Sequence, residues 1–127
     1  MNPEKRYYTQ DHEWLRVEEG DEAVVGISDH AQKALGDITF IDLPKPGKGV
    51  KIHDTLAVVE SVKAASDVFS PIQGTVAEVN TALANEPEKI NQDPYGAGWI
   101  CRLTGCDLSV VAKLMTEAQY QDYLAKH

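Results

Sequence analysis

The sequence predicts an all-β fold, either a β-sandwich or a small barrel. Its 127 residues contain many short apolar or alternating segments that recur about every ten residues, a spacing typical of such folds. Nine Gly and six Pro residues fall largely between those segments, where they end regular structure. Helical signals are confined to the edges. No linker or low-complexity segment divides the chain, so we expect one domain over residues 1–127.

Alternating apolar residues bounded by turn residues place the strands. A polar turn at 18–21 is expected to join the first strand pair as a hairpin. The prolines and glycine of 44–47 end a later strand. Extended segments are expected at Tyr7–Thr9, Trp14–Val17, Ala23–Ile27, Ile38–Leu43, Val50–Ile52, Thr55–Glu60, Val68–Phe69, Thr75–Asn80 and Trp99–Leu103.

Strict alternation also predicts which side chains share a face. In Ile38–Leu43 it places Ile38 and Phe40 together and turns Ile41 to the other side. In Thr75–Asn80 it groups Val76, Glu78 and Asn80 against Thr75, Ala77 and Val79.

Capping residues predict two longer helices and several short ones. Ser28 is a favourable N-cap, and Gly36 ends the helix that follows it. Thr116–Gln119 has the form of a capping box, so a helix is expected at the end of the chain. Residues 108–114 suggest a short helix and residues 81–84 a single turn. The segment 85–94 contains two prolines and is expected to be a polar connection.

Composition and charge exclude several classes of function. The formal net charge is -8, and such an acidic domain repels nucleic-acid backbones and anionic membranes. No run approaches the roughly 18 apolar residues of a membrane span. The first residues lack the apolar run of a secretory signal, so we expect a cytoplasmic chain or one that is already mature. An acidic surface also permits docking onto basic patches of partner proteins.

No catalytic or metal-binding constellation is present in the sequence. The four histidines are scattered among polar neighbours without a positioned partner. No glycine-rich segment opens a helix after a strand, so there is no phosphate loop or dinucleotide fingerprint. Cys101 and Cys106 lack nearby ligand partners and are most simply free thiols. The absence of catalytic machinery favours a binding or carrier module.

One segment offers what a carrier needs. Leu56–Val59 and Val68–Phe69 read as the two arms of a hairpin with Lys63 near its tip. The turn lacks the Asn-Gly or Asp-Gly signal of tight hairpins, and most lysines are ordinary surface charges. The neighbours of Lys63 are nevertheless small, which leaves room for a modifying enzyme. The lysine amine becomes a good acyl acceptor once that enzyme removes its proton.

The segments around Lys63 resemble those of one known family. Glu60-Ser61-Val62-Lys63-Ala64, with Ser66-Asp67 and Ser70-Pro71 after it, is similar to the lipoylation segment of the H protein of the glycine cleavage system. Residues 7–125 resemble that family in the family's order. The matching blocks are Tyr8-Thr9, His12-Glu13-Trp14, Val25–Gln32, Leu35–Ile38, Leu43-Pro44, Gly74–Asn80, Ile90-Asn91, Pro94–Gly96 and Gly98-Trp99.

The resemblance implies a fold and a function. The fold would be a barrel-sandwich hybrid of two antiparallel β-sheets, with short peripheral helices and a C-terminal helix. Lys63 would carry lipoate through an amide, and the chain would be a non-catalytic lipoyl carrier in one-carbon metabolism. The carrier would take the aminomethyl group of glycine from the P protein (glycine decarboxylase) to the T protein (aminomethyltransferase) and electrons to the L protein (dihydrolipoamide dehydrogenase). A lipoate-attaching enzyme would be a further partner, and we expect a monomer.

The resemblance also implies roles for four other residues. Glu60 would help the lipoate-attaching enzyme to recognise the hairpin. Glu13, His30 and Asp67 would line or adjoin a cleft that shields the loaded arm, and a carboxylate there could bind the cargo amine. The alternative for Glu13 is a plain turn carboxylate. Cys101 and Cys106 match no family pattern and gain no role.

Three alternatives to the glycine cleavage carrier remain open at this point. The chain could be an H-like lipoyl donor or scaffold that passes lipoate to other enzymes. It could be a biotin carrier, although biotin domains usually flank their lysine with methionines and Val62 and Ala64 flank this one. An independent enzyme would require turnover of glycine by the chain alone.

Overall fold

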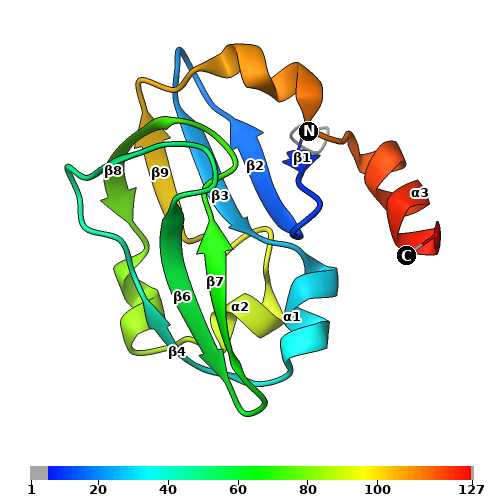
Figure 1. Cartoon of the computed structure of the whole chain (residues 1–127). Helices are drawn as coiled ribbons and strands as arrows, with labels where there is room; N and C mark the ends of the chain where they lie inside the picture. Colours follow the sequence, from blue (N-terminus) through cyan, green and yellow to red (C-terminus); the bar gives the residue numbers. More distant parts are fainter. Residues whose placement is uncertain (1–5, 127) are drawn as a thin grey trace.

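Two antiparallel β-sheets form the molecule (Figure 1). The computed structural model describes residues 6–126. The larger sheet has six strands in the order β1-β2-β3-β9-β8-β5. Neighbouring strands of this sheet are antiparallel, and β9 lies between β3 and β8. Its strands are β1 (Arg6–Tyr8), β2 (Glu13–Val17), β3 (Ala23–Ile27), β5 (Gly49–Val50), β8 (Gly74–Val79) and β9 (Cys101–Thr104).

The smaller sheet contains the predicted hairpin. Its order is β4-β6-β7, with β4 spanning Ile38–Asp42, β6 Thr55–Ser61 and β7 Ala65–Phe69. Strands β6 and β7 pair in register through Glu60 and Ala65, directly before the tip. In Figure 1 the tip projects at the end of the molecule opposite the short helix η2 (Leu108–Lys113). The expected barrel-sandwich arrangement of two sheets is confirmed.

The core lies between the two sheets. Leu15 and Leu103 of the larger sheet and Ile41, Val59 and Val68 of the smaller one belong to a single buried cluster. Each side chain removed from water there stabilises the fold by roughly 1.5–3 kcal/mol. The cluster holds the two layers together and gives the hairpin a rigid base.

A second buried cluster attaches the C-terminal helix. Tyr8 and Tyr120 stack with ring centroids 4.2 Å apart, and Trp14 packs in the same cluster. Gly26 lies opposite Trp14 in the register of β2 and β3. A Cβ atom at Gly26 would lie 2.7 Å from the indole ring, so only glycine leaves room for this tryptophan.

The helices follow their capping residues. Helix α1 spans Asp29–Leu35, with the Ser28 side chain accepting from Ala31 N and Gly36 at its end, as predicted. Helix α3 spans Glu117–Lys126. Its capping box is formed, because Thr116 N donates to Gln119 Oε1 and Gln119 N donates to Thr116 Oγ1. The remaining short helices are η1 (Thr81–Ala84), α2 (Lys89–Gln92) and η2.

Bulges overturn both predicted face assignments. In β4 the register with β6 shifts between Ile38 and Phe40. Ile38 and Ile41 are therefore both buried, whereas Phe40 is 49% exposed. In β8 the register shifts between Val76 and Glu78, so Val76 is buried and Glu78 is exposed. An extra residue in a strand reverses the alternation beyond it, and period-two patterning cannot reveal it.

Three local predictions were also wrong. The segment 85–94 is not only a connection, because helix α2 lies within it and buries Ile90; a single apolar residue gives no helical period to detect. Ile52 lies in an exposed turn and not in a strand with Val50. The last strand begins at Cys101, two residues later than expected.

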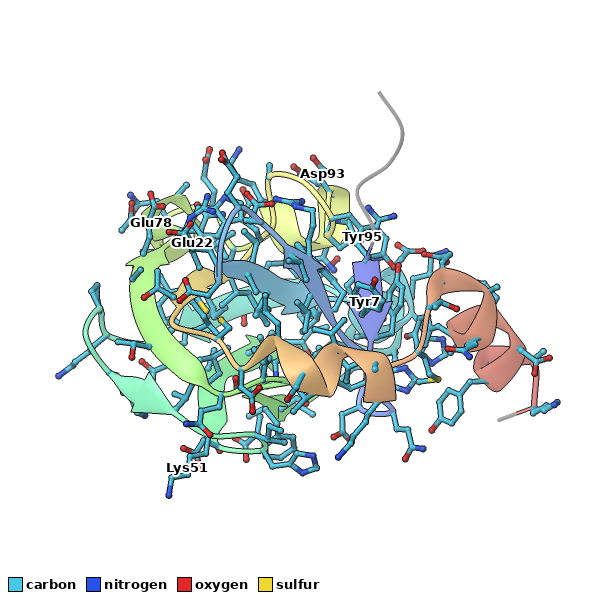
Figure 2. The ribbon with its side chains drawn as sticks, turned by 90° about the horizontal axis from the view of Figure 1, so that it is seen from above. Tyr7, Glu22, Lys51, Glu78, Asp93 and Tyr95 are labelled. Atoms are coloured by element: carbon cyan, nitrogen blue, oxygen red, sulfur yellow. The ribbon has the colours of Figure 1, made fainter. Side chains whose placement is uncertain are left out.

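Charge pairing is concentrated on the larger sheet. Arg102 lies within 3.2 Å of Glu18, 3.6 Å of Glu22 and 3.3 Å of Glu78. Figure 2 shows Glu22 and Glu78 on the same edge of the molecule. The network is partly exposed, so its contribution to stability is small. Arg102 therefore gives the carboxylates of Glu18, Glu22 and Glu78 a cationic partner.

Candidate functional site

Lys63 lies in the exposed loop 61–64 that joins β6 to β7. The Ser61 backbone N donates to the Ala64 carbonyl over 2.8 Å. The Ser61 hydroxyl oxygen also accepts from the backbone N–H groups of Lys63 and Ala64, at 3.1 and 3.2 Å. Tight hairpin loops usually need residues with positive φ. In the described chain the non-glycine residues with positive φ are His12 and His53, so this turn is held by the serine side chain instead.

The loop is also fixed from outside the hairpin. The Val62 backbone N donates to the Asp37 carbonyl over 3.0 Å, which ties the tip to the turn between α1 and β4. The aliphatic part of Lys63 lies over the neighbouring glycine, since a Cβ atom at Gly36 would be 3.6 Å from Lys63 Cε. Gly36 has φ +78°, a conformation that side chains disfavour. The backbone of Lys63 is braced while its amine faces solvent.

Asn91 of α2 holds the turn that braces the tip. Its Nδ2 donates to the Gly36 carbonyl over 2.8 Å and to Gln32 Oε1 over 2.9 Å. Its Oδ1 accepts from the Ile38 backbone N at 2.9 Å. One amide therefore connects the end of α1 to the start of β4, on either side of Asp37. The loop that carries Lys63 is therefore bonded to Asp37, and the two neighbours of Asp37 are bonded to Asn91.

Glu13 is a buried carboxyl group at the start of β2. It is 2% exposed. Its Oε1 accepts from Thr9 Oγ1 at 2.7 Å, and its Oε2 accepts from the Phe69 backbone N of β7 at 3.2 Å. Burial raises the pKa of Glu13 from its ordinary 4.5 to about 7, although these two hydrogen bonds oppose the shift. Glu13 is thus not a plain turn carboxylate.

Glu13 lines a cleft of about 530 Å³. The walls come from the turn after β1, the turn at 52–53, residues 70–71 and helix η2. The lining includes apolar side chains such as Ile52 and Leu114, the acidic groups of Asp11 and Glu13, and the cationic group of Lys113. The cleft thus combines apolar surface with ionisable groups of both signs.

The structure does not bring all the predicted cleft residues together. His30 lies on α1, where its ring centroid is 4.5 Å from that of His12. It lines a separate hollow between α1 and α3, together with Lys33 and Tyr120. Asp67 is exposed on β7 and lines neither hollow, although Phe69, two residues further along the strand, binds Glu13. The roles expected of His30 and Asp67 stay predictions.

Glu60 is exposed on β6, three residues before Lys63. Its Cα partner across the sheet is Phe40 of β4, and its carbonyl accepts from Thr39 Oγ1 at 3.3 Å. The carboxylate of Glu60 has no ion-pair partner among residues 6–126. The side chain therefore stands on the outer face of the hairpin, beside the tip, where its expected role in recognition stays a prediction.

The two cysteine thiols line neither the Lys63 loop nor the cleft beside Glu13. Cys101 and Cys106 are buried and free, and burial raises their pKa values to about 12 and about 11. Over residues 6–126, no three His, Cys, Asp or Glu side chains are arranged to hold a metal ion. None of the described helices is long and apolar enough to cross a membrane.

A family comparison agrees with this geometry. The family model described as "Glycine cleavage H-protein" matches residues 6–127, which includes the hairpin, the cleft and both sheets. The chain belongs to the glycine cleavage H-protein family. Membership gives the class of function, a lipoyl carrier of the glycine cleavage system and not a catalyst.

Relatives named as glycine cleavage system H proteins share about half of their residues with the chain. The protein from Leptospira biflexa is 51% identical over 120 residues, which cover 94% of this chain and 91% of the relative. The protein from Thermus thermophilus is 48% identical over 122 residues, covering 96% and 94%. The crystal structure of a glycine cleavage system H protein from Mycobacterium marinum superposes with a TM-score of 0.86 at 37% identity, covering 98% of this chain and 99% of that one.

The sequence singles out Lys63 as the candidate lysine but does not reveal the residues that brace it. In the sequence, Asn91 belongs to the block Ile90-Asn91, inside a segment expected to be a connection. The signal that could have located it is an amide next to a buried isoleucine. Ser61 belongs to the lysine segment in the sequence. Its role in closing the turn can be recognised only from the hairpin geometry, because its hydroxyl accepts from the backbone N–H groups of Lys63 and Ala64.

Proposed function

We propose that Lys63 carries lipoate and that the chain shuttles the aminomethyl group of glycine within the glycine cleavage system. The single observation that supports this best is the exposure of Lys63 on a tip braced by Ser61, Asp37 and Asn91. A braced tip presents one amine in a constant position to several partners, while the surrounding sheet moves little. Family membership supports lipoate as the attached arm.

The chain's part in loading is to offer one nucleophile. The amine of Lys63 loses a proton to the lipoate-attaching enzyme and attacks the activated carboxyl carbon of lipoate. A C–N amide bond forms, the activating group leaves with the bonding electrons, and the positive charge of the lysine disappears. The small side chains of Ala64 and Ala65 leave space around the amine, and the solvent-exposed tip fits a group that must reach several enzymes.

Once attached, lipoate would supply a dithiolane that accepts the aminomethyl unit and two electrons. The partners of this cycle would be the P, T and L proteins, and every catalytic step would belong to them. Residues of this chain would bind and orient the arm and exclude water from it. We expect these partners to work with the chain in the cytoplasm.

The cleft beside Glu13 suits the loaded arm. Phe69, which binds Glu13, lies six residues after Lys63, or about 20 Å along the strand, and Asp67 lies about 13 Å along it. An arm bound at Lys63 would pass Asp67 before it approached the cleft. A cationic amine near Glu13 would stabilise the carboxylate and lower its pKa from about 7. The cleft would then bind the amine of the cargo, and any Glu13 that is still protonated would release its proton.

Intact-mass measurement tests this proposal. Chain produced in a host that attaches lipoate is expected to gain one lipoyl group, and Lys63→Arg is expected to gain none. Lys51→Arg, which alters another exposed lysine, is the matched control and should gain the same mass as the wild-type chain. Equal masses for the wild-type chain and Lys63→Arg would contradict the proposal.

Reconstitution separates the glycine cleavage carrier from a lipoyl donor. Purified P, T and L proteins with the loaded chain are expected to convert glycine, and omission of the chain should abolish that conversion. A fully lipoylated chain that fails to support the three proteins would instead indicate a donor or scaffold.

A further inference from the structure

The outer face of the smaller sheet has an unusual composition. Two rows of paired residues cross the strands β4, β6 and β7 on this face. The first row is Phe40, Glu60 and Ala65. The second row is Asp42, Val58 and Asp67. These side chains are exposed or half-buried, whereas the intervening row of Ile41 and Val59 is buried. We call these six residues the hairpin face: Phe40, Asp42, Val58, Glu60, Ala65 and Asp67.

Phe40 is on this face because of the bulge in β4. Without the register shift between Ile38 and Phe40, strict alternation would place Phe40 on the same side as the buried Ile38. Instead the aromatic ring is 49% exposed, and Val62 at the tip is 66% exposed. Of the large apolar side chains in residues 6–126, the exposed ones are Phe40, Ile52 and Val62. Val62 directly precedes Lys63, and Phe40 pairs in register with Glu60, three residues before Lys63. Bulges often serve to re-aim a side chain.

The carboxylates of the hairpin face lack internal partners. Asp42, Glu60 and Asp67 form no ion pair with any residue in 6–126, in contrast to the acidic groups around Arg102 on the larger sheet. Strands β4, β6 and β7 carry no Lys, Arg or His. At one border of the face, Lys45 and Lys48 line a hollow together with Asp42, without an ion pair to it. The face is therefore acidic around one aromatic ring.

The position of the face determines which partner it meets. Glu60 is three residues before Lys63, and Val62 is its neighbour. An enzyme that acylates Lys63 must enclose the amine itself, so it covers the tip and the strands that lead to it. Enzymes that act on the far end of a long arm do not need to approach the lysine so closely. An apolar residue flanked by unpaired charges is typical of a binding hot spot with a polar rim.

We propose that the hairpin face is the docking surface for the enzyme that acylates Lys63, with Phe40 inserted in an apolar pocket and the three carboxylates facing basic side chains of that enzyme. This inference rests on the proposed function, since it requires that Lys63 be acylated. It extends recognition from Glu60 to Phe40, Asp42 and Asp67, which lie on two other strands. The acidic face would steer the enzyme to the hairpin, and Phe40 would hold it there.

The first test measures acylation kinetics of the full chain. The unmodified wild-type chain, F40A and F40L are incubated with a purified lipoate–protein ligase, lipoate and ATP, and Lys63 acylation is followed by intact mass. We expect F40A to lower kcat/KM about tenfold, the size of a typical aromatic anchor, mainly through KM. F40L keeps an apolar side chain and should recover most of the rate. Thermal melting of each variant shows that it is folded.

The second test measures how the negative charge of the hairpin face affects the rate of acylation. D42K and E19K change the net charge equally, but Glu19 lies in the exposed turn between β2 and β3, away from the hairpin face. D42K is expected to lower kcat/KM and to weaken its dependence on salt concentration, because opposite charges attract less strongly as ionic strength rises. E19K should behave as the wild-type chain.

The outcomes distinguish a failure of Lys63 lipoylation from a failure of the hairpin face as the docking surface. If the wild-type chain gains no lipoyl mass at all, the proposed function itself fails. If Lys63 is acylated normally in the wild-type chain, F40A and D42K alike, the hairpin face is not the docking surface. If F40A slows only glycine conversion by the P, T and L proteins, the face belongs to one of those partners and the inference is overturned.

Discussion

Glu13→Gln isolates the effect of burying a carboxyl group at the start of β2. The amide has nearly the same shape as the carboxyl group but carries no charge at any pH. Its oxygen can still accept from the Phe69 backbone N or from Thr9 Oγ1, the two donors that Glu13 binds. The variant therefore removes an ionisation and leaves most of the packing.

The sign of the pH effect follows from the direction of the pKa shift. The pKa of Glu13 is about 7 in the folded chain against an ordinary 4.5, so between these values the folded state holds a proton that the unfolded state has released. The wild-type free energy of unfolding is highest, as far as Glu13 is concerned, below pH 4.5. It falls as the pH rises to about 7 and is constant above. The loss between pH 5 and pH 8 is about 2.5 kcal/mol.

Urea unfolding of both proteins at pH 5 and pH 8 measures how the ionisation of Glu13 changes the free energy of unfolding. The stability of Glu13→Gln relative to the wild-type chain should increase by about 2.5 kcal/mol from the lower to the higher pH, because other titrating groups are common to both proteins and cancel. Glu19→Gln alters an exposed carboxylate and should show no such increase. A relative stability of Glu13→Gln that is the same at both pH values would refute the reasoning.

Two further substitutions test the supports of the site. Asn91→Ala leaves the Ile38 N–H and the Gly36 carbonyl without their partner, so we expect a loss of about 2 kcal/mol in urea unfolding and faster hydrogen exchange at the tip; unchanged exchange there would disconnect Asn91 from Lys63. Gly26→Ala places a methyl group 2.7 Å from the Trp14 ring and should lower stability by about 1–3 kcal/mol with a shift in tryptophan fluorescence. If Gly26→Ala melts at the same temperature as the wild-type chain, the Trp14 ring can move aside without loss of stability, which would contradict this prediction.

Local chemistry made several features predictable from sequence. Ser28 and Gly36 mark α1 because a hydroxyl satisfies the first N–H groups and glycine accepts the reversed backbone at the end. The capping box of α3 follows the same logic. The two hairpins around residues 18–21 and 61–64 follow from short apolar segments separated by turns. The resemblance around Lys63 pointed to the correct family.

Features that depend on pairing between distant residues were not predictable. The bulges in β4 and β8 exist only relative to β6 and β9, and they decide that Phe40 faces outward. The single apolar residue of α2 gives no period, yet Asn91 reaches three groups around the α1–β4 turn. The separation of Glu13 from His30 into different hollows likewise depends on where α3 packs.

Lys63 illustrates the division between the two kinds of information. The sequence by itself determined that a lysine with small neighbours lies near the tip of a hairpin in an acidic, non-catalytic chain of this family. Only the tertiary structure decided that the tip is braced through Asp37, that Glu13 is buried at the hairpin base, and that Phe40 is exposed across from Glu60. The physical reason is that turn and capping preferences act over a few residues, whereas burial, register and pKa depend on groups brought together by the fold.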